Sequence, residues 1–128
     1  MIEIGVRGCA ETRVANENTA EMMGSGDCPV FATPAMVALM EKAACLSVAP
    51  YLGEGETTVG VSLNIRHSAA TALGRAVRAE SELIEVDGRK LLFRVTAYDD
   101  AGEIGGGEHA RAIVNREKFL TRTEQRGR

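Results

Sequence analysis

The fold is decided by Thr33-Pro34-Ala35-Met36-Val37-Ala38-Leu39-Met40-Glu41-Lys42-Ala43-Ala44-Cys45-Leu46-Ser47-Val48-Ala49, the longest apolar segment of the chain. Its Ala, Leu and Met residues favour a helix. We expect Thr33 at the N-cap and Pro34 in the first helical position, with Pro50 and Gly53 as the stop signal. Apolar side chains cover nearly the whole circumference, whereas a surface helix of a soluble protein has one apolar stripe. The helix must therefore be covered on most sides, by a sheet with or without a partner chain.

Strand patterns lie on both sides of this helix. Residues 2–14 alternate weakly and predict a first strand, and residues 16–29 predict a loop with a helical turn around Thr19–Met23. After the helix, four further strands are predicted within Thr57–Ser68, Arg75–Val86, Arg89–Tyr98 and Glu103–Glu117.

Finer patterns constrain these strands. Asp87-Gly88 is a strong hairpin signal that suits a type I′ turn. In the strand after the helix we expect one row of side chains to face the helix, namely Val59, Val61, Leu63, Ile65 and His67. The run Gly105-Gly106-Gly107 weakens a strand and indicates a bulge or a close approach of a ligand or backbone.

The order is one strand, one long helix and four strands that we expect to form an antiparallel meander. A sheet curled around one central helix would bury that helix, which is the α+β hotdog fold with about five strands. The alternative is a cystatin-like or NTF2-like half-cone, in which helices more often precede the whole sheet. We expect one domain over residues 1–128, with residues 121–128 as a frayed tail.

Composition excludes several classes of function. The 128 residues carry a net charge of −3 and no basic stripe of the kind that a nucleic-acid binder needs. We find neither a membrane span nor a signal peptide and expect a cytoplasmic protein. Cys9, Cys28 and Cys45 lack CxxC spacing, so we expect small buried or half-buried thiols rather than disulfides or a zinc site. We expect no metal and no cofactor.

Glu41 is the most unusual residue of the helix. It lies in line with Val37, Ala44 and Val48, and a carboxylate on an apolar stripe is costly unless it is paired or functional. A solvent-facing position is the alternative. His67 ends an apolar strand row, where a structural histidine is the commoner case. His109, the other histidine, shares its strand register with Arg111.

The chain resembles the fluoroacetyl-CoA thioesterase family of hotdog proteins from about Val30 to Phe119. The resemblance is carried by Val30-Phe31-Ala32-Thr33-Pro34, Leu39-Met40-Glu41, Val59-Gly60, His67-Ser68-Ala69-Ala70-Thr71, Gly88-Arg89-Lys90-Leu91, Glu108-His109-Ala110-Arg111 and Arg116-Glu117-Lys118-Phe119. It implies an enzyme that hydrolyses a small acyl-CoA thioester. The implied catalytic group is Thr33, Glu41 and His67, and the implied substrate-binding residues are Val30, Phe31, Gly60 and Arg111.

One segment departs from the family pattern. The family's fluoroacetyl-specific enzyme has a phenylalanine-bearing lid just before the matching segment, whereas Met23–Pro29 contains no aromatic residue here. We therefore expect thioesterase chemistry without a strong preference for fluorinated substrates. The alternative function is a non-catalytic acyl-CoA or small-ligand binding module. A hotdog hydratase is weaker, because the chain has no Asp-x4-His pair.

The spacing of Thr33 and Glu41 also bears on assembly. Eight residues of helix separate them by about 12 Å along the axis, more than two side chains on one helix easily span. Two antiparallel helices in a two-fold dimer would bring the start of one beside the middle of the other. We therefore expect a homodimer whose sites lie at the subunit interface.

Overall fold

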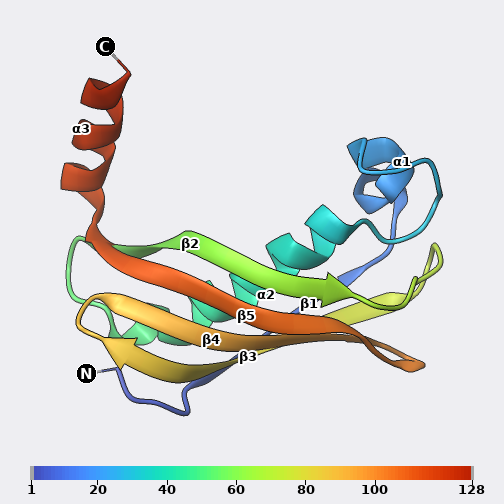
Figure 1. The fold of residues 1–128 in the computed structure, drawn as a ribbon, viewed down its shortest axis with the longest axis horizontal. Helices are drawn as coiled ribbons and strands as arrows, with labels where there is room; N and C mark the ends of the chain where they lie inside the picture. Colours follow the sequence, from blue (N-terminus) through green and yellow to red (C-terminus); the bar gives the residue numbers. More distant parts are fainter. Residues whose placement is uncertain (1, 128) are drawn as a thin grey trace.

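The computed structural model describes residues 2–127 and has an α+β architecture (Figure 1). Strand β1 (Arg7–Arg13) comes first and is followed by the short helices η1 (Asn16–Asn18) and α1 (Ala20–Met23). The long helix α2 (Thr33–Val48) continues into the turn η2 (Ala49–Tyr51). The remaining elements, in chain order, are β2 (Glu56–His67), β3 (Ala76–Asp87), β4 (Lys90–Asp99), β5 (Gly102–Asn115) and α3 (Arg116–Arg126).

The five strands form one antiparallel sheet in the order β1-β3-β4-β5-β2. The predicted four-strand meander is therefore wrong for its first member, because β2 pairs with β5 and not with β3. Residues 68–75 connect β2 to β3 as a crossing between separate parts of the sheet. This crossing leaves an edge of β3 free to pair with β1.

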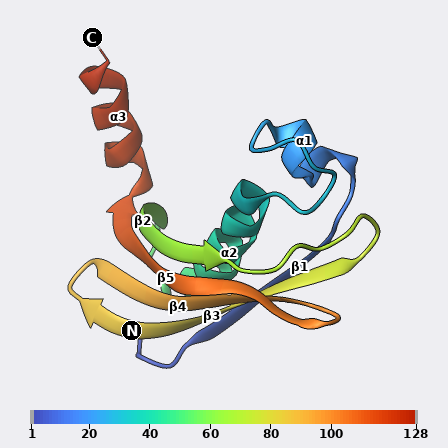
Figure 2. The same cartoon turned by 45° about the vertical axis from the view of Figure 1, so that its right-hand side comes forward.

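Helix α2 lies on the face around which the sheet curls (Figure 2), packed chiefly against β1 and β3. Its buried apolar side chains are Met36, Leu39, Met40, Ala43, Ala44 and Val48. From β4 the predicted row is buried as expected, namely Leu91, Phe93, Val95 and Ala97. This arrangement confirms the hotdog fold. The helix is not covered all round, since Leu46 is 52% exposed.

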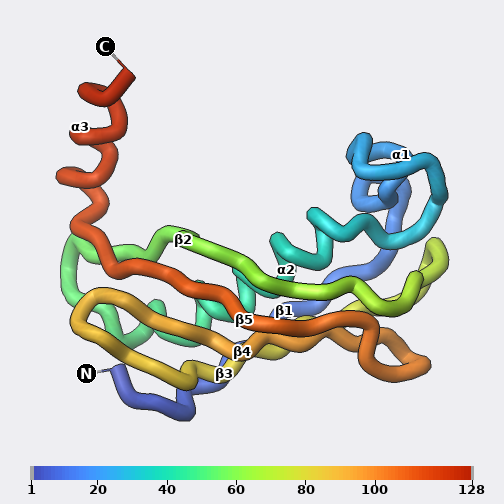
Figure 3. Tube along the Cα trace, in the orientation of Figure 1, coloured from blue at the N-terminus to red at the C-terminus, as the bar shows by residue number. Residues whose placement is uncertain are grey.

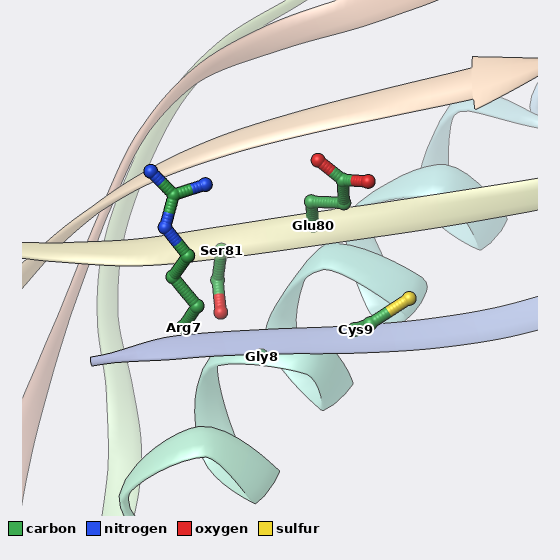
Figure 4. A pocket seen from close by; sticks show the side chains of 5 residues that line it. All are labelled: Arg7, Gly8, Cys9, Glu80 and Ser81. Atoms are coloured by element: carbon green, nitrogen blue, oxygen red, sulfur yellow. The ribbon is translucent and has the colours of Figure 1, made fainter. Parts of the chain in front are cut away.

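A glycine allows the close approach of α2 to the sheet. Figure 4 shows Gly8 on β1 between Arg7 and Cys9, beside Glu80 and Ser81 of β3, with α2 passing close to β1. A Cβ at position 8 would overlap the Ala43 carbonyl oxygen and would lie 2.7 Å from Ser47 Cβ. The helix therefore contacts the strand backbone directly at this point.

Strand β2 departs from the predicted alternation. A β-bulge interrupts its pairing with β5 between Gly60 and Ser62. Val61 and Leu63, expected to face the helix, are 64% and 38% exposed, whereas Thr58 is buried. The bulge changes the side-chain alternation, and β2 is the edge strand beside β5, so Val61 and Leu63 are not covered by α2. Ile65 and His67 lie on the helix side as predicted, since Ile65 packs against the core and His67 contacts Thr33.

Glycines explain two further local features. In the β3–β4 hairpin Asp87 pairs with Lys90, and of the loop residues Gly88 and Arg89 only Gly88 has a positive φ, of 61°. This is the pattern of a type II′ turn and corrects the predicted type I′. The close backbone approach predicted for the glycine run is confirmed, because a Cβ on Gly105 would lie 2.5 Å from the Arg66 carbonyl oxygen.

The chain end differs from the predicted frayed tail, since α3 is helical as far as Arg126. Its N-cap Asn115 accepts a hydrogen bond from the Lys118 amide at 3.0 Å, which stabilises the first turn. Figure 1 shows α3 projecting away from the sheet. No helix within residues 2–127 is long and apolar enough to cross a membrane.

We predict that Gly8→Ala destabilises the fold by about 1–3 kcal/mol, because the added methyl group must displace the α2 backbone. The free energy of unfolding in a urea titration measures the effect. Gly26→Ala is the matched control, since a Cβ there would have its nearest contact at 3.5 Å, from Ala20 Cβ. The control should change stability by less than about 0.5 kcal/mol, and an equal loss in the two variants would contradict the role of Gly8.

Candidate active site

Thr33 and His67 form a hydrogen-bonded pair where α2 begins. The N-cap is Ala32, in an extended conformation, and Thr33 is the first helical residue. The predicted N-cap role of Thr33 is therefore wrong by one position, because its hydroxyl is engaged elsewhere. Thr33 Oγ1 lies 2.8 Å from Nδ1 of His67, the last residue of β2. The hydroxyl is thus held beside an imidazole instead of capping the helix.

The surroundings of His67 favour its neutral form. Burial lowers the pKa of the imidazole, and this outweighs the raising effect of the nearby Ala69 backbone. The Phe31 ring meets it edge-on with ring centroids 6.5 Å apart. Nε2 is buried without a hydrogen-bond partner among the described residues. A neutral imidazole with one free ring nitrogen can accept or relay a proton near neutral pH.

A small pocket adjoins this pair. It has a volume of about 240 Å³, and its lining includes four predicted site residues, Val30, Phe31, Thr33 and His67, together with Ala20 and Ser25. Figure 3 shows how the chain between β1 and α2 loops out and returns at the N-terminal end of the helix. The loop therefore forms one wall of the pocket, and the helix start forms another.

Glu41 occupies a separate position, midway along α2. Its side chain is 37% exposed, and Oε2 lies 3.6 Å from Arg111 Nη1 and 3.9 Å from His109 Nε2. A Cβ on Gly60 would overlap Glu41 Oε2, so the glycine provides the room that the carboxylate occupies. The structure thus brings Glu41 together with Gly60 and Arg111, two of the predicted substrate-binding residues, in a position half open to solvent.

His109 belongs to this second group, although sequence reasoning did not place it among the site residues. It is fully buried, and its Nε2 lies 3.1 Å from Arg111 Nη1. The sequence feature that could have indicated His109 is its position two residues before Arg111, which places both side chains on the same face of β5. What the sequence could not show is that the inward side of β5 at this point contacts Glu41.

The predicted catalytic residues therefore fall into two groups in one chain. Thr33 and His67 lie at the start of α2, and Glu41 lies with Gly60 and Arg111 about two turns further along. No contact joins the two groups among the described residues. A single chain does not assemble all three catalytic candidates around one point.

The pocket of Figure 4 lacks comparable chemistry. It has a volume of about 330 Å³ and lies over β1 and β3, lined by Arg7, Gly8, Cys9, Glu80 and Ser81. Its thiol is a weak nucleophile, because partial burial and the nearby carboxylates of Glu11 and Glu80 raise the pKa of Cys9.

The cysteines and the possible metal-binding side chains of residues 2–127 form neither disulfides nor a metal site. All three thiols are free. Cys9 and Cys28 are exposed, which corrects the expected burial, and Cys45 is half-buried. Within that range no group of three or more His, Cys, Asp or Glu side chains is arranged to hold a metal ion.

The chain is similar to known thioesterases in sequence and structure. It is 45% identical to the fluoroacetyl-CoA thioesterase of Streptantibioticus cattleyicolor over 97 residues, which cover 76% of this chain and 70% of that protein. A solved structure of the fluoroacetyl-CoA thioesterase FlK superposes with a TM-score of 0.91 at 37% identity, covering 98% of this chain and 97% of that one. A thioesterase superfamily member from Thermus thermophilus gives a TM-score of 0.88 at 32% identity over 98% and 96% of the two chains.

Fold and neighbours together define a hotdog-fold thioesterase, a hydrolase of thioesters. Within that class the chain belongs to the fluoroacetyl-CoA-specific thioesterase family, FlK, whose sequence profile matches residues 14–117. The resemblance drawn from the motifs and the prediction of a thioester hydrolase are confirmed.

We predict that stability falls as the pH is lowered from about 7 to about 5. Burial lowers the pKa of His67 and of His109, and Arg111 lowers that of His109 further. The unfolded chain, with histidine pKa values of roughly 6.5, then binds protons that the folded chain does not. The contribution of the two neutral histidines to the free energy of unfolding is thus fully present above the unfolded-state pKa and is lost as the pH falls below it.

Melting temperatures at steps across this range measure the effect. The double variant His67→Gln/His109→Gln should show a flatter profile. The lowered pKa of Glu56 acts below its ordinary value of 4.5 and so outside this window. A wild-type profile that is flat, or that rises on acidification, would contradict the prediction.

Proposed function

We propose that this thioesterase hydrolyses a small acyl-CoA to the free acid and CoA by means of Glu41, His67 and Thr33. The observation that carries the proposal is the Glu41 carboxylate, half open to solvent beside Arg111, in the space that Gly60 leaves free. Such a carboxylate has access to substrate and water and has a cation to balance its charge. Arg111 and Gly60 are proposed to help place the thioester and the CoA moiety, and Val30 and Phe31 to contact the acyl group.

Glu41 has two possible roles in this proposal. As a general base it takes a proton from water, whose oxygen adds to the thioester carbonyl while the C–S bond breaks. As a nucleophile its own oxygen adds to the carbonyl, the C–S bond breaks and CoA leaves as its thiolate, and water then hydrolyses the resulting mixed anhydride to free acid and restored carboxylate. The products are the same by both routes, a free acid and CoA.

His67 and Thr33 assist at the leaving group and the carbonyl. The neutral imidazole of His67 accepts the proton that Glu41 takes from water and gives it to the departing thiolate sulfur. The Thr33 hydroxyl, held at 2.8 Å from that ring, and free backbone N–H groups at the start of α2 stabilise negative charge on the carbonyl oxygen.

The substrate class follows from the pocket beside Thr33 and His67. Its volume of about 240 Å³ suits a short acyl group. The segment from Met23 to Pro29 has no aromatic side chain to provide the phenylalanine lid of the fluoroacetyl-specific enzyme. The proposal is therefore a small acyl-CoA without a requirement for fluorine.

The proposed enzyme is a homodimer. Strand β2 ends the sheet with an unpaired edge, and exposed apolar side chains lie along it at Val61 and Leu63, with Leu46 exposed on α2. An edge strand of this kind is a template for pairing with a second copy. Antiparallel α2 helices would then bring Thr33 and His67 of one chain beside the partner's Glu41.

We predict that Glu41→Gln lowers the rate of thiol release by at least about 100-fold while the protein stays folded, because the amide is neither a base nor a nucleophile. A thiol-release assay over a panel of acyl-CoAs, including acetyl-CoA and fluoroacetyl-CoA, measures the loss. Glu54→Gln, on an exposed loop, is the matched control and should keep wild-type turnover. Near wild-type turnover by a folded Glu41→Gln protein would contradict the role of Glu41, and acyl-CoA binding without turnover by the wild type would favour the binding module.

We predict that two inactive proteins complement each other. Thr33→Ala and Glu41→Gln proteins are mixed in equal amounts and their subunits are exchanged. If each site takes Thr33 from one chain and Glu41 from the other, half of the dimers regain one of two sites, and about a quarter of wild-type activity returns.

Each inactive protein exchanged with itself is the control for this mixture. His67→Ala replaces Thr33→Ala if loss of the hydroxyl alone leaves turnover. No recovery after demonstrated exchange would mean that both groups act from one chain, and a monomer by light scattering at the assay concentration would remove the dimer altogether.

A further inference from the structure

His109 is a buried histidine for which the proposed mechanism has no use. Its side chain is fully buried on β5, with its ring stacked on that of Phe93 at a centroid distance of 6.3 Å and an angle of 29°. Burying a polar ring costs free energy unless each of its polar atoms is hydrogen-bonded. Both nitrogens of His109 have hydrogen-bond partners, and one of these partners, Arg111, contacts Glu41.

Those hydrogen bonds fix the protonation state of the ring. Nδ1 lies 2.9 Å from the Ser62 carbonyl oxygen, which can only accept, so Nδ1 carries the hydrogen. Nε2 lies 3.1 Å from Arg111 Nη1, which can only donate, so Nε2 presents its lone pair. The imidazole is therefore neutral, consistent with a pKa lowered first by burial and then by the Arg111 charge.

Arg111 is held by neutral acceptors on three of its nitrogens. Nε donates to Thr58 Oγ1 at 2.9 Å, Nη2 donates to the Thr58 carbonyl oxygen at 3.0 Å, and Nη1 donates to His109 Nε2. None of these partners cancels the positive charge. The carboxylate beside the guanidinium is that of Glu41, 3.6 Å from Nη1, and Nη1 is the nitrogen that His109 positions.

The β2 bulge links these contacts. It lies between Gly60, which leaves room for the Glu41 carboxylate, and Ser62, whose carbonyl oxygen accepts from His109. One local irregularity thus sets both the place of the carboxylate and the tautomer of the imidazole. An apolar residue at position 109 would fill the core without providing the acceptor that Nη1 requires.

We infer that His109 is a positioning residue for the thioesterase reaction, whose Nε2 lone pair aims the Arg111 guanidinium at the Glu41 carboxylate. The inference rests on the proposed function of Glu41. Turnover therefore depends on the hydrogen-bond acceptor at Nε2 of His109 rather than on the volume of the side chain or its aromatic ring.

Two conservative variants separate the two hydrogen bonds. In His109→Gln the amide oxygen reaches the place of Nε2 and can accept from Arg111. In His109→Asn the shorter amide reaches the place of Nδ1 and can donate to Ser62, but Arg111 loses its acceptor. His109→Phe keeps the stacked ring and loses both bonds. Phe93→Leu is the packing control, since it alters the stack and keeps both bonds.

Thiol release and melting temperature are measured for all four variants. We expect kcat of His109→Gln within a few-fold of wild type, and kcat of His109→Asn and His109→Phe lower by roughly 10- to 100-fold, the usual range for a hydrogen bond to a charged group. Phe93→Leu should lower the melting temperature and leave kcat of the folded protein unchanged. If His109→Phe does not fold, the Gln–Asn comparison at equal folded fraction decides.

Equal kcat for His109→Gln and His109→Asn would overturn the inference, as would losses that follow the melting temperature in every variant including Phe93→Leu. The proposed function fails separately. It is overturned if wild type releases no thiol or if Glu41→Gln retains turnover, whereas an active wild type that Glu41→Gln inactivates leaves only the role of His109 in question.

Discussion

The contact on which the structure depends is that of α2 with the curled face of the sheet. An apolar helix of this length is stable in water only when other elements remove most of its surface from solvent. The contact is made at backbone distance, since Gly8 leaves no side chain between β1 and the Ala43 carbonyl oxygen. The sheet can therefore bury one side of the helix along its length, while Leu46 on α2 remains exposed.

Burial on one side explains how the helix tolerates a carboxylate. Glu41 lies near the β2 edge of the sheet, where its carboxylate contacts residues of β2 and β5, and its side chain keeps partial access to water. A fully buried carboxylate would have to be neutralised or tightly paired. The half-open position keeps the Glu41 carboxylate in partial contact with water, with Arg111 supplying the balancing charge.

Both histidines are neutral in the fold, and both are held by hydrogen bonds to fixed partners. His67 is paired with a hydroxyl and keeps one ring nitrogen free, which suits proton transfer. His109 has both nitrogens occupied and is stacked on Phe93, which suits a fixed scaffold. The two rings differ in whether a nitrogen is free to form a further hydrogen bond, not in charge. This separates His67, proposed to transfer protons, from His109, proposed to position Arg111.

The sequence alone determined the central helix, the strand segments and the identity of Thr33, Glu41 and His67 as candidates, because these depend on local periodicity and on motifs within single segments. It did not determine the strand order, the bulge at Gly60 and Ser62, or the orientation of Thr33. Those depend on contacts between distant segments: β2 pairs with β5 rather than with β3, and the Thr33 hydroxyl lies against His67 instead of capping the helix. The buried group of His109, Arg111 and Thr58 likewise exists only once β5 lies between β2 and β4, since no local pattern indicates which polar side chains will meet in the interior.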